Sequence, residues 1–328
     1  MNIYLTLDYE IYFGEQHGSV TKCIIEPVNR LREISKRTGV LMTYFIDIGH
    51  VIALERNIPK FPELKIDLDL LIKNIKDLVN EGNDCQLHIH PHWETSTYKN
   101  NKWQFDYSKY KLVDFDKKNI FEIFSTYKNK LESITKLPVN SFRAGGWCLQ
   151  PFSKIKDVFI QTEIKIDSTV FPEGKSNSKY YFYDFTNCPK KSNWKFSNNL
   201  CEEDENGDFL ELPISSYNYS PLFFWKLFLL GNLFPKNHKP LGDGKPMPSI
   251  GFRKKVLTKG GRFSANLEGY YVTKLPAIIK QNKNKGYQDT VILGHPKALT
   301  KFSLIKLEEQ INKLKSKNSF MRFSDVKI

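Results

Sequence analysis

Short apolar segments that are typical of β-strands alternate with longer segments of helical periodicity along most of the chain. Strands are predicted at residues 3–7, 40–48, 84–87, 139–143, 164–170 and 288–293, and helices at 27–37, 67–81, 116–134, 151–161, 268–285 and 303–315. Such alternation favours parallel βαβ units, and a barrel of these units gathers its chemistry where the strands end. The sequence therefore predicts an α/β fold built on parallel strands.

The length of the chain suits one large domain. It has 328 residues, 40% of them hydrophobic, and no Gly/Ser-rich or Pro-rich linker divides it. We therefore expect a single domain over residues 1–328, with an insertion at about 175–265. Inside the insertion, strand-like residues 180–185 and 209–215 flank the acidic residues 202–208, which predicts a solvated hairpin.

The cysteines are odd in number and scattered, without a C-x-x-C pair. They are Cys23, Cys85, Cys148, Cys188 and Cys201. This pattern favours reduced thiols over a disulfide framework or a cysteine-type zinc site. Residues 1–8 read as a first strand and not as a signal peptide. We therefore expect a cytoplasmic protein.

The chain carries a formal net charge of +13 and has a pI near 9.3. Its lysines are dispersed among asparagines, and no recognition helix, zinc finger or RNA-binding motif accompanies them. We therefore expect no nucleic-acid partner.

Three histidines follow the predicted strand at 84–87 within five residues: His88, His90 and His92. On an extended backbone their side chains share one face, while Pro91 argues against a helix. A structural histidine cluster is the alternative to a metal site. Catalytic zinc sites use three protein ligands and keep one position for water, so a metal site here needs a carboxylate or a further imidazole.

Other polar residues also lie at or near predicted strand ends. Asp8 and Glu10 flank Tyr9 after the first strand, and Arg143, Asp167 and His295 follow or end later ones. Carboxylates at such positions commonly cap turns. Two on one face can instead share a metal and a proton-transfer task.

Residues 221–234 are very apolar but too short to span a bilayer, and they contain Lys226. A basic stretch continues to Arg262. A buried helix or lid is one interpretation, and peripheral membrane contact through residues 221–262 is another.

An ordered set of motifs spans nearly the whole chain: Leu5-Thr6-Leu7-Asp8-Tyr9-Glu10, His88-x-x-x-His92, Phe142-Arg143-Ala144-Gly145-Gly146-Trp147, Asp167 and Leu293-Gly294-His295-Pro296. The set resembles the polysaccharide deacetylases of the NodB-homology, or carbohydrate esterase 4, family. The resemblance implies a distorted (β/α)7-type barrel. It also implies a hydrolase that removes N- or O-acyl groups, acetyl or formyl, from sugars with one divalent metal: zinc, or alternatively Co²⁺, Ni²⁺ or Mn²⁺.

Carried over by position, the resemblance makes His88 and His92 metal ligands and Asp8 the catalytic base. Arg143 would orient that base, His295 would be the general acid, and Asp167 would support His295. The family's usual pair of adjacent aspartates is absent, because Tyr9 follows Asp8. An acid-x-acid version makes Glu10 the third ligand, with Asp8 or His90 as alternatives. The proline that usually follows the motif arginine is also missing, which affects the expected acyl contacts.

Substrate contacts are expected from several neighbours of these motifs. They are Tyr9, His90, Trp93, Gly145, Gly146 and Trp147. The glycine N–H groups could hold an oxyanion, and the aromatic rings could stack on a sugar or pack in the core.

The expected partner is a saccharide of surface-polysaccharide biosynthesis: an amino sugar, nucleotide-linked, lipid-linked or oligomeric. The enzyme would act in the cytoplasm or at the inner face of the membrane. A catalytically inactive glycan-binding barrel is the alternative. The sequence leaves the sugar, the acyl group and the oligomeric state open.

Overall fold

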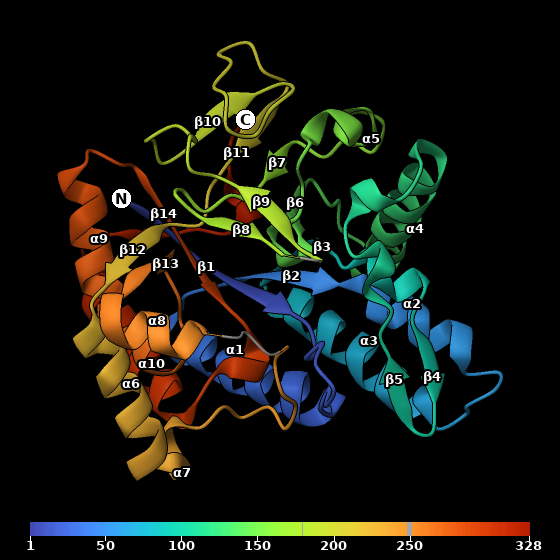
Figure 1. The fold of residues 1–328 in the computed structure, drawn as a ribbon, viewed down its shortest axis with the longest axis horizontal. Helices are drawn as coiled ribbons and strands as arrows, with labels where there is room; N and C mark the ends of the chain where they lie inside the picture. Colours follow the sequence, from blue (N-terminus) through green and yellow to red (C-terminus); the bar gives the residue numbers. More distant parts are fainter. Residues whose placement is uncertain (179, 248–250) are drawn as a thin grey trace. The chain divides into compact units, whose positions relative to one another are not determined.

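The computed structural model describes residues 1–178, 180–247 and 251–328. Its backbone divides into two compact units (Figure 1). The first unit comprises Met1–Met42 and Ile214–Met321, and the second comprises Thr43–Pro213 and Arg322–Ile328. The single domain over residues 1–328 and the insertion at 175–265 remain predictions. Residues 179 and 248–250 of that insertion lie outside the described residues.

The first unit is built on a parallel pair of strands from opposite ends of the chain. Strand β1 (Asn2–Tyr9) pairs with β14 (Asp289–Gly294), with Leu7 opposite Gly294, and β15 (Ser319–Phe320) also pairs with β1. Strand β1 is buried on both faces: Ile3, Leu5 and Leu7 on one face are at most 2% exposed, and Tyr4 and Thr6 on the other are at most 3% exposed. The antiparallel strands β12 (Ser216–Tyr219) and β13 (Gly261–Ser264) form a second sheet.

The helices of the first unit confirm most of the predicted ones. The α-helices are α1 (Glu26–Thr38), α6 (Pro221–Leu233), α7 (Pro235–His238), α8 (Phe252–Lys259), α9 (Leu275–Asn284) and α10 (Lys301–Leu314). A π-helical turn, η1 (Thr21–Ile25), and the 3-10 turns η7 (Gly269–Lys274) and η8 (Pro296–Ala298) join them. Helix α1 buries Val28, Leu31 and Ile34 as predicted, and it ends at Gly39, whose φ of 71° suits glycine.

The second unit contains a sheet in the order β10-β11-β7-β6-β3-β2. Its strands are β2 (Thr43–Asp47), β3 (Asp84–Ile89), β6 (Ser141–Ala144), β7 (Ile166–Asp167), β10 (Trp194–Phe196) and β11 (Phe209–Glu211). All neighbours are parallel except β10 and β11, which form an antiparallel hairpin around residues 202–208. Its first strand is Trp194–Phe196, and the predicted strand at residues 180–185 instead contains β9 (Phe182–Asp184), which pairs with β8 (Lys175–Asn177). In this register His88 lies opposite Arg143.

The described residues of the second unit form the α-helices α2 (Ile48–Asn57), α3 (Leu64–Asn80), α4 (Lys117–Thr135) and α5 (Lys156–Gln161). The unit also has two small hairpins, β4 (Thr97–Lys99) with β5 (Lys102–Gln104) and β8 (Lys175–Asn177) with β9 (Phe182–Asp184). Short 3-10 turns occur at Pro91–Glu94, Tyr107–Lys109, Leu112–Asp114, Gly145–Trp147, Phe152–Lys154 and Phe323–Asp325. Helix α4 starts where the Asp116 carboxylate accepts a 2.9 Å hydrogen bond from the Asn119 N–H.

The expectation that all five cysteines are free thiols is wrong for two of them. Cys188 and Cys201 form a disulfide in the second unit, whereas Cys23, Cys85 and Cys148 are free and buried. The two partners lie 13 residues apart, without a C-x-x-C spacing, so their pairing depends on how the loop between β9 and β11 folds back. The cysteines therefore do not indicate a reducing compartment.

Candidate functional site

In the first unit, the parallel pairing of β1 and β14 brings predicted site residues together. Both strands end on the same side of the pair, so Asp8 and Glu10 after Leu7 lie beside His295 after Gly294. Asp8 and Glu10 are 4% and 5% exposed. Buried carboxylates of this kind require a compensating partner, and the first unit supplies two cations for them.

One of these cations is His295. Its Nε2 lies 3.7 Å from Asp8 Oδ2 and 3.7 Å from Glu10 Oε1, and its Nδ1 lies 2.6 Å from Glu268 Oε1. Burial alone would lower the pKa of His295. The carboxylates of Glu268, Asp8 and Glu10 outweigh that effect and raise the pKa above its ordinary value. The Nδ1–H therefore donates to Glu268, and the nearby carboxylates favour a second proton on Nε2, which faces Asp8 and Glu10.

Within the first unit, Glu268 is the carboxylate that holds His295, and the supporting role of Asp167 stays a prediction. The segment before Glu268 runs beside β14, because the Leu267 N–H donates a 2.8 Å hydrogen bond to the Leu293 carbonyl. In the sequence Glu268 merely opens a predicted helix. No local signal indicated a role for it.

The second cation is Lys297, which no local sequence pattern indicates. Its Nζ donates 2.7 Å hydrogen bonds to Glu10 Oε1 and to the Ile11 carbonyl, and the residue is only 7% exposed. The ammonium lies 5.1 Å from the ring centroids of Tyr12 and Phe13. Lys297 therefore neutralises one Glu10 oxygen within the protein itself.

In the second unit, the pairing of β3 with β6 orients His88. The Nδ1 of His88 lies 2.8 Å from the Arg143 carbonyl oxygen, so the Nδ1–H donates to it. This tautomer leaves the lone pair on Nε2. Histidines that bind metals usually hold their second nitrogen in this way, so His88 has the orientation of a ligand.

The three histidines do not continue one extended face. His90 is extended, with φ −106° and ψ 95°, but Pro91 starts a 3-10 turn that contains His92. The rings of His88 and His90 lie 4.9 Å apart, with a nitrogen of each within 4.8 Å of the other. The ring of His92 instead stacks on Tyr110 at 5.5 Å and 5°. The prediction of a shared face is therefore wrong at His92, and its role as a ligand stays a prediction.

Arg143 is fully buried in the second unit. Its Nε donates a 2.9 Å hydrogen bond to the Ser168 carbonyl, and another guanidinium nitrogen donates to Ser168 Oγ at 3.0 Å. The guanidinium also lies 4.1 Å from the Phe45 ring centroid. These contacts fix its direction, which a residue that orients a base requires.

Asp167 belongs to a buried acidic pair with Glu211. The Asp167 carboxylate accepts hydrogen bonds from the backbone N–H and the hydroxyl of Thr169, at 3.0 and 2.8 Å. Burial raises the pKa of Asp167, while burial together with the Asp167 charge raises that of Glu211 well above its ordinary value. Glu211 is therefore the member of the pair that holds a proton more readily. No local sequence pattern marks Glu211 as a partner of Asp167.

The structure contradicts a sugar-stacking role for Trp93. Its ring is 0% exposed, stacks on His50 at 4.8 Å, and donates from Nε1 to Asp47 Oδ2 at 2.7 Å. The core-packing alternative therefore holds for this residue. Tyr9 is likewise only 2% exposed. Both rings pack in the interior, and the sequence pattern does not distinguish a buried aromatic ring from an exposed one.

The turn after β6 remains a candidate contact region. Trp147 is half-buried, and its ring lies 5.1 Å from that of Phe171 and 5.6 Å from that of Tyr183. A Cβ at Gly145 would come within 2.5 Å of His90 Nδ1, so the glycine permits the imidazole to lie against the backbone. Gly146 has φ 59°, which also favours glycine.

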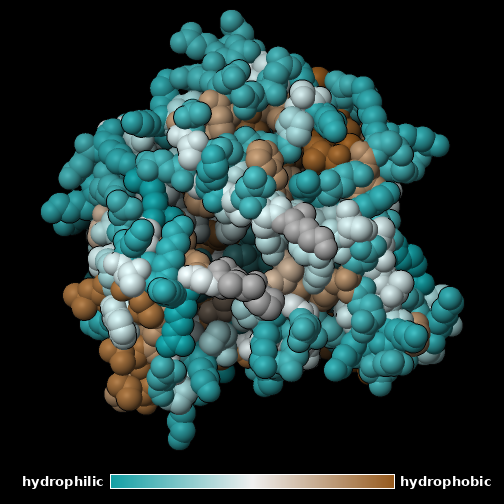
Figure 2. Space-filling model, in the orientation of Figure 1, coloured by the Kyte–Doolittle hydropathy of each residue, from teal (hydrophilic) through white to brown (hydrophobic). Residues whose placement is uncertain are grey.

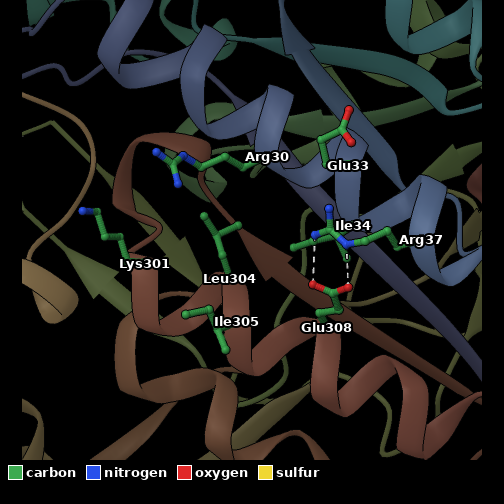
Figure 3. A pocket seen from close by; sticks show the side chains of 8 residues that line it. All are labelled: Arg30, Glu33, Ile34, Arg37, Lys301, Leu304, Ile305 and Glu308. Atoms are coloured by element: carbon green, nitrogen blue, oxygen red, sulfur yellow. Dashed lines mark hydrogen bonds and ion pairs between the residues drawn. The ribbon is translucent and has the colours of Figure 1, made fainter.

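A separate surface pocket of the first unit lies between α1 and α10 and contains none of the predicted site residues (Figure 3). Its side chains come from Arg30, Glu33, Ile34, Arg37, Lys301, Leu304, Ile305 and Glu308. Two hydrogen bonds of 2.7 and 2.9 Å join the Arg37 guanidinium to Glu308. This exposed pair of hydrogen bonds links the two helices.

No protein-family model and no curated protein sequence matches the chain. Solved structures do match it. A candidate polysaccharide deacetylase from Mycobacterium smegmatis covers 98% of this chain and 87% of its own, with a TM-score of 0.55 at 12% identity. The chain has a polysaccharide-deacetylase fold. The fold class expected from the sequence, an α/β fold of the distorted (β/α)7-barrel type, is thereby confirmed.

Other similar structures carry different activities in their titles. Puue allantoinase covers 99% of this chain and 88% of its own, with a TM-score of 0.52 at 10% identity. The Bc1960 peptidoglycan N-acetylglucosamine deacetylase covers 98% and 86%, with a TM-score of 0.41 at 13% identity. At such low sequence identities, a shared polysaccharide-deacetylase fold does not identify the reaction that this protein catalyses.

Proposed function

We propose that this protein is a metal-dependent hydrolase that removes an N- or O-acyl group, acetyl or formyl, from a sugar. The observation that carries the proposal is the acid–base group of the first unit. The carboxylates of Asp8, Glu10 and Glu268, which are buried or half-buried, surround the imidazole of His295. Glu268 is the nearest of them and contacts Nδ1 of that ring. Amide and ester hydrolysis commonly use a general base and a general acid, and enzymes built on βα barrels place such groups where the strands end.

The chemistry of the side chains fits one divalent metal. His88 holds its Nδ1–H on a backbone carbonyl, and His90 brings a second ring nitrogen close to it. We propose His88, Glu10 and either His90 or His92 as ligands, which is the imidazole and carboxylate set of catalytic zinc sites. Zinc is the first candidate, with Co²⁺, Ni²⁺ or Mn²⁺ as alternatives. A bound metal of this class acidifies water and polarises a carbonyl.

The remaining roles fall to the side chains of the chain itself. Asp8 would accept the proton of the attacking water, oriented by Arg143. His295 would donate its Nε2 proton to the leaving sugar amine or alcohol, while Glu268 keeps the ring charged. The backbone N–H groups of the turn at Gly145 and Gly146 would stabilise the oxyanion.

Two measurements on the purified protein test the proposal. Elemental analysis should find about one divalent ion per chain in wild type, less in Glu10→Ala, and none in the double variant His88→Ala/His90→Ala. Acetate and formate release from N-acylated amino sugars should then fall about 100-fold or more in His295→Ala. A wild-type protein that stays metal-free in excess zinc and cobalt would refute the hydrolytic reading.

One contact favours a second candidate function, a glycan-binding barrel without turnover. Lys297 Nζ bonds to Glu10 Oε1 at 2.7 Å and so competes for the carboxylate that a metal needs. Calorimetric binding of a glycan, without metal uptake and without acyl release, would support this alternative.

The wider setting stays a proposal that rests on the sequence. The substrate would be an amino sugar of surface-polysaccharide biosynthesis, nucleotide-linked, lipid-linked or oligomeric, and the site of action the cytoplasm. The disulfide between Cys188 and Cys201 does not favour a reducing compartment. Fractionation of cells that express the protein would test the location.

A further inference from the structure

Helix α6 of the first unit exposes a row of large apolar side chains. Leu222, Trp225, Leu229 and Leu233 are 76%, 50%, 51% and 68% exposed. Their spacing of three or four residues places them along one side of the helix, a row here called the α6 stripe. Brown surface covers α6 in Figure 2, whereas most of the visible surface is teal.

The opposite side of α6 is already packed. Phe223 and Phe224 are buried in a cluster with Tyr219 and Val256. The α6 stripe is therefore not the face that fixes the helix to the protein. Burying large apolar side chains is favourable, so such a row calls for a partner outside this packing.

Helix α8 lies against α6 and brings positive charge to the stripe. Trp225 Nε1 donates a 3.1 Å hydrogen bond to the Leu257 carbonyl, and the Arg253 guanidinium lies 4.9 Å from the Phe228 ring centroid. Residues 221–262 contain nine lysines or arginines and a single acid, Asp243.

Seven exposed cations belong to α6, α7 and α8 or adjoin them, and are here called the basic flank: Lys226, Lys236, Lys239, Arg253, Lys254, Lys255 and Lys259. Within the described residues, none of the seven has a carboxylate oxygen within 4.0 Å. Exposed lysines elsewhere, such as Lys22 and Lys117, do have carboxylate partners. No nearby carboxylate of the described residues therefore neutralises the positive charge of the basic flank, which lies beside the apolar α6 stripe.

We propose that the α6 stripe and the basic flank form a docking face for a bilayer surface that carries anionic headgroups. Apolar side chains that enter the acyl boundary, with lysines and arginines at headgroup level, are the signature of interfacial helices. The stripe is about 17 Å long, too short to span a bilayer but suited to lie in its plane. In the part of the chain that the structure describes, no helix has the length and apolarity to cross a membrane.

The positive charge of the basic flank favours a bilayer over a second copy of this chain as the partner of the α6 stripe. A symmetric dimer through the α6 stripe would bring two basic flanks together, and their like charges would repel. An anionic surface instead neutralises all seven. Nucleic acid would satisfy the charges but would leave the leucines of the stripe exposed to water.

Vesicle co-sedimentation of the full chain tests the proposal. Wild type should bind vesicles of phosphatidylcholine with about 30% phosphatidylglycerol, and hardly bind phosphatidylcholine alone. Added salt should weaken binding. The charge variant Arg253→Gln/Lys254→Gln/Lys255→Gln should lower the partition coefficient about 100-fold. The stripe variant Leu222→Ser/Leu229→Ser/Leu233→Ser should lower it by a similar factor.

Matched controls change equally exposed residues elsewhere. Lys65→Gln/Lys117→Gln/Lys118→Gln removes three cations, and Ile66→Ser/Ile305→Ser removes two exposed apolar side chains. Both should bind as wild type does. Absence of wild-type binding, or equal binding by the charge variant and its control, would overturn the proposal. So would a dimer in sedimentation velocity that the stripe variant abolishes, since a second copy would then cover the stripe.

Discussion

One carboxylate oxygen of Glu268 contacts His295 twice: Oε1 lies 2.6 Å from Nδ1 and accepts a 3.1 Å hydrogen bond from the backbone N–H. The ring and its own backbone are therefore tied to the same atom. This leaves the imidazole one orientation, in which Nε2 faces Asp8 and Glu10. His295 and the residue that orients it thus lie 27 residues apart in the sequence.

Replacing Glu268 by glutamine should lower the pKa of His295, because the neutral amide removes the charge that opposes burial. The alkaline limb of the activity profile should then move to lower pH, with activity at neutral pH reduced about tenfold or more. Histidine-selective NMR titration would measure the pKa directly. Glu309→Gln, a surface change on α10, is the control. An unshifted alkaline limb in Glu268→Gln would disprove the role.

His90→Ala should weaken metal binding, whereas His92→Ala should lower the stability of the fold. His90 lies beside His88, so its loss should weaken metal affinity about 100-fold, with little change in stability. His92 stacks on Tyr110, so its loss should cost about 1–3 kcal/mol of unfolding free energy while metal binding persists. Metal titration and denaturant unfolding measure the two quantities. The reverse outcome would instead establish the His88 and His92 pair that the family resemblance implies.

Glu211→Gln should remove a pH dependence of stability. Burial first, and the charge of Asp167 second, raise the pKa of Glu211 in the folded protein above its unfolded value. The free energy of unfolding of wild type therefore falls as the pH rises from the unfolded pKa towards the folded pKa. Glutamine cannot ionise. The difference in melting temperature, Glu211→Gln minus wild type, should therefore grow between about pH 5 and about pH 9. Glu205→Gln in the exposed turn is the control, and a pH-independent difference for Glu211→Gln would contradict the assignment.

Gly145→Ala should disturb His90, because the new methyl group would come within 2.5 Å of Nδ1. Displacement of the ring should weaken metal binding and cost about 1–3 kcal/mol of stability. Gly231→Ala is a matched control: its Cβ meets nothing within 4 Å, and α6 should gain about 0.5–1 kcal/mol. Equal metal affinity in wild type and Gly145→Ala would show that the ring has room to move.

The sequence was most informative where hydrophobic periodicity and strand ends coincide. Strands β1, β3 and β14 and helices α1, α3 and α4 were predicted within a few residues, because their buried faces repeat regularly. Helix α2 was missed, since it follows β2 directly with no turn residue between Asp47 and Ile48.

The partners of the site residues were harder to predict. Glu268, Lys297 and Glu211 act through contacts whose sequence separations no local pattern encodes, from 27 residues for Glu268 to 287 for Lys297. Trp93 was misassigned because an aromatic residue beside histidines looks the same in sequence whether it is exposed or, as here, buried. His92 was placed on the strand because the 3-10 turn after Pro91 has no distinct signal.

The carbonyl that holds His88 belongs to the main chain of β6, and no side chain substitution at Arg143 can remove it. His88 can therefore acquire its orientation only after β3 and β6 have aligned in the observed register. A metal ion would therefore bind His88 only after the second unit has folded. A chelator would remove the metal but leave the imidazole in the orientation that binds another ion.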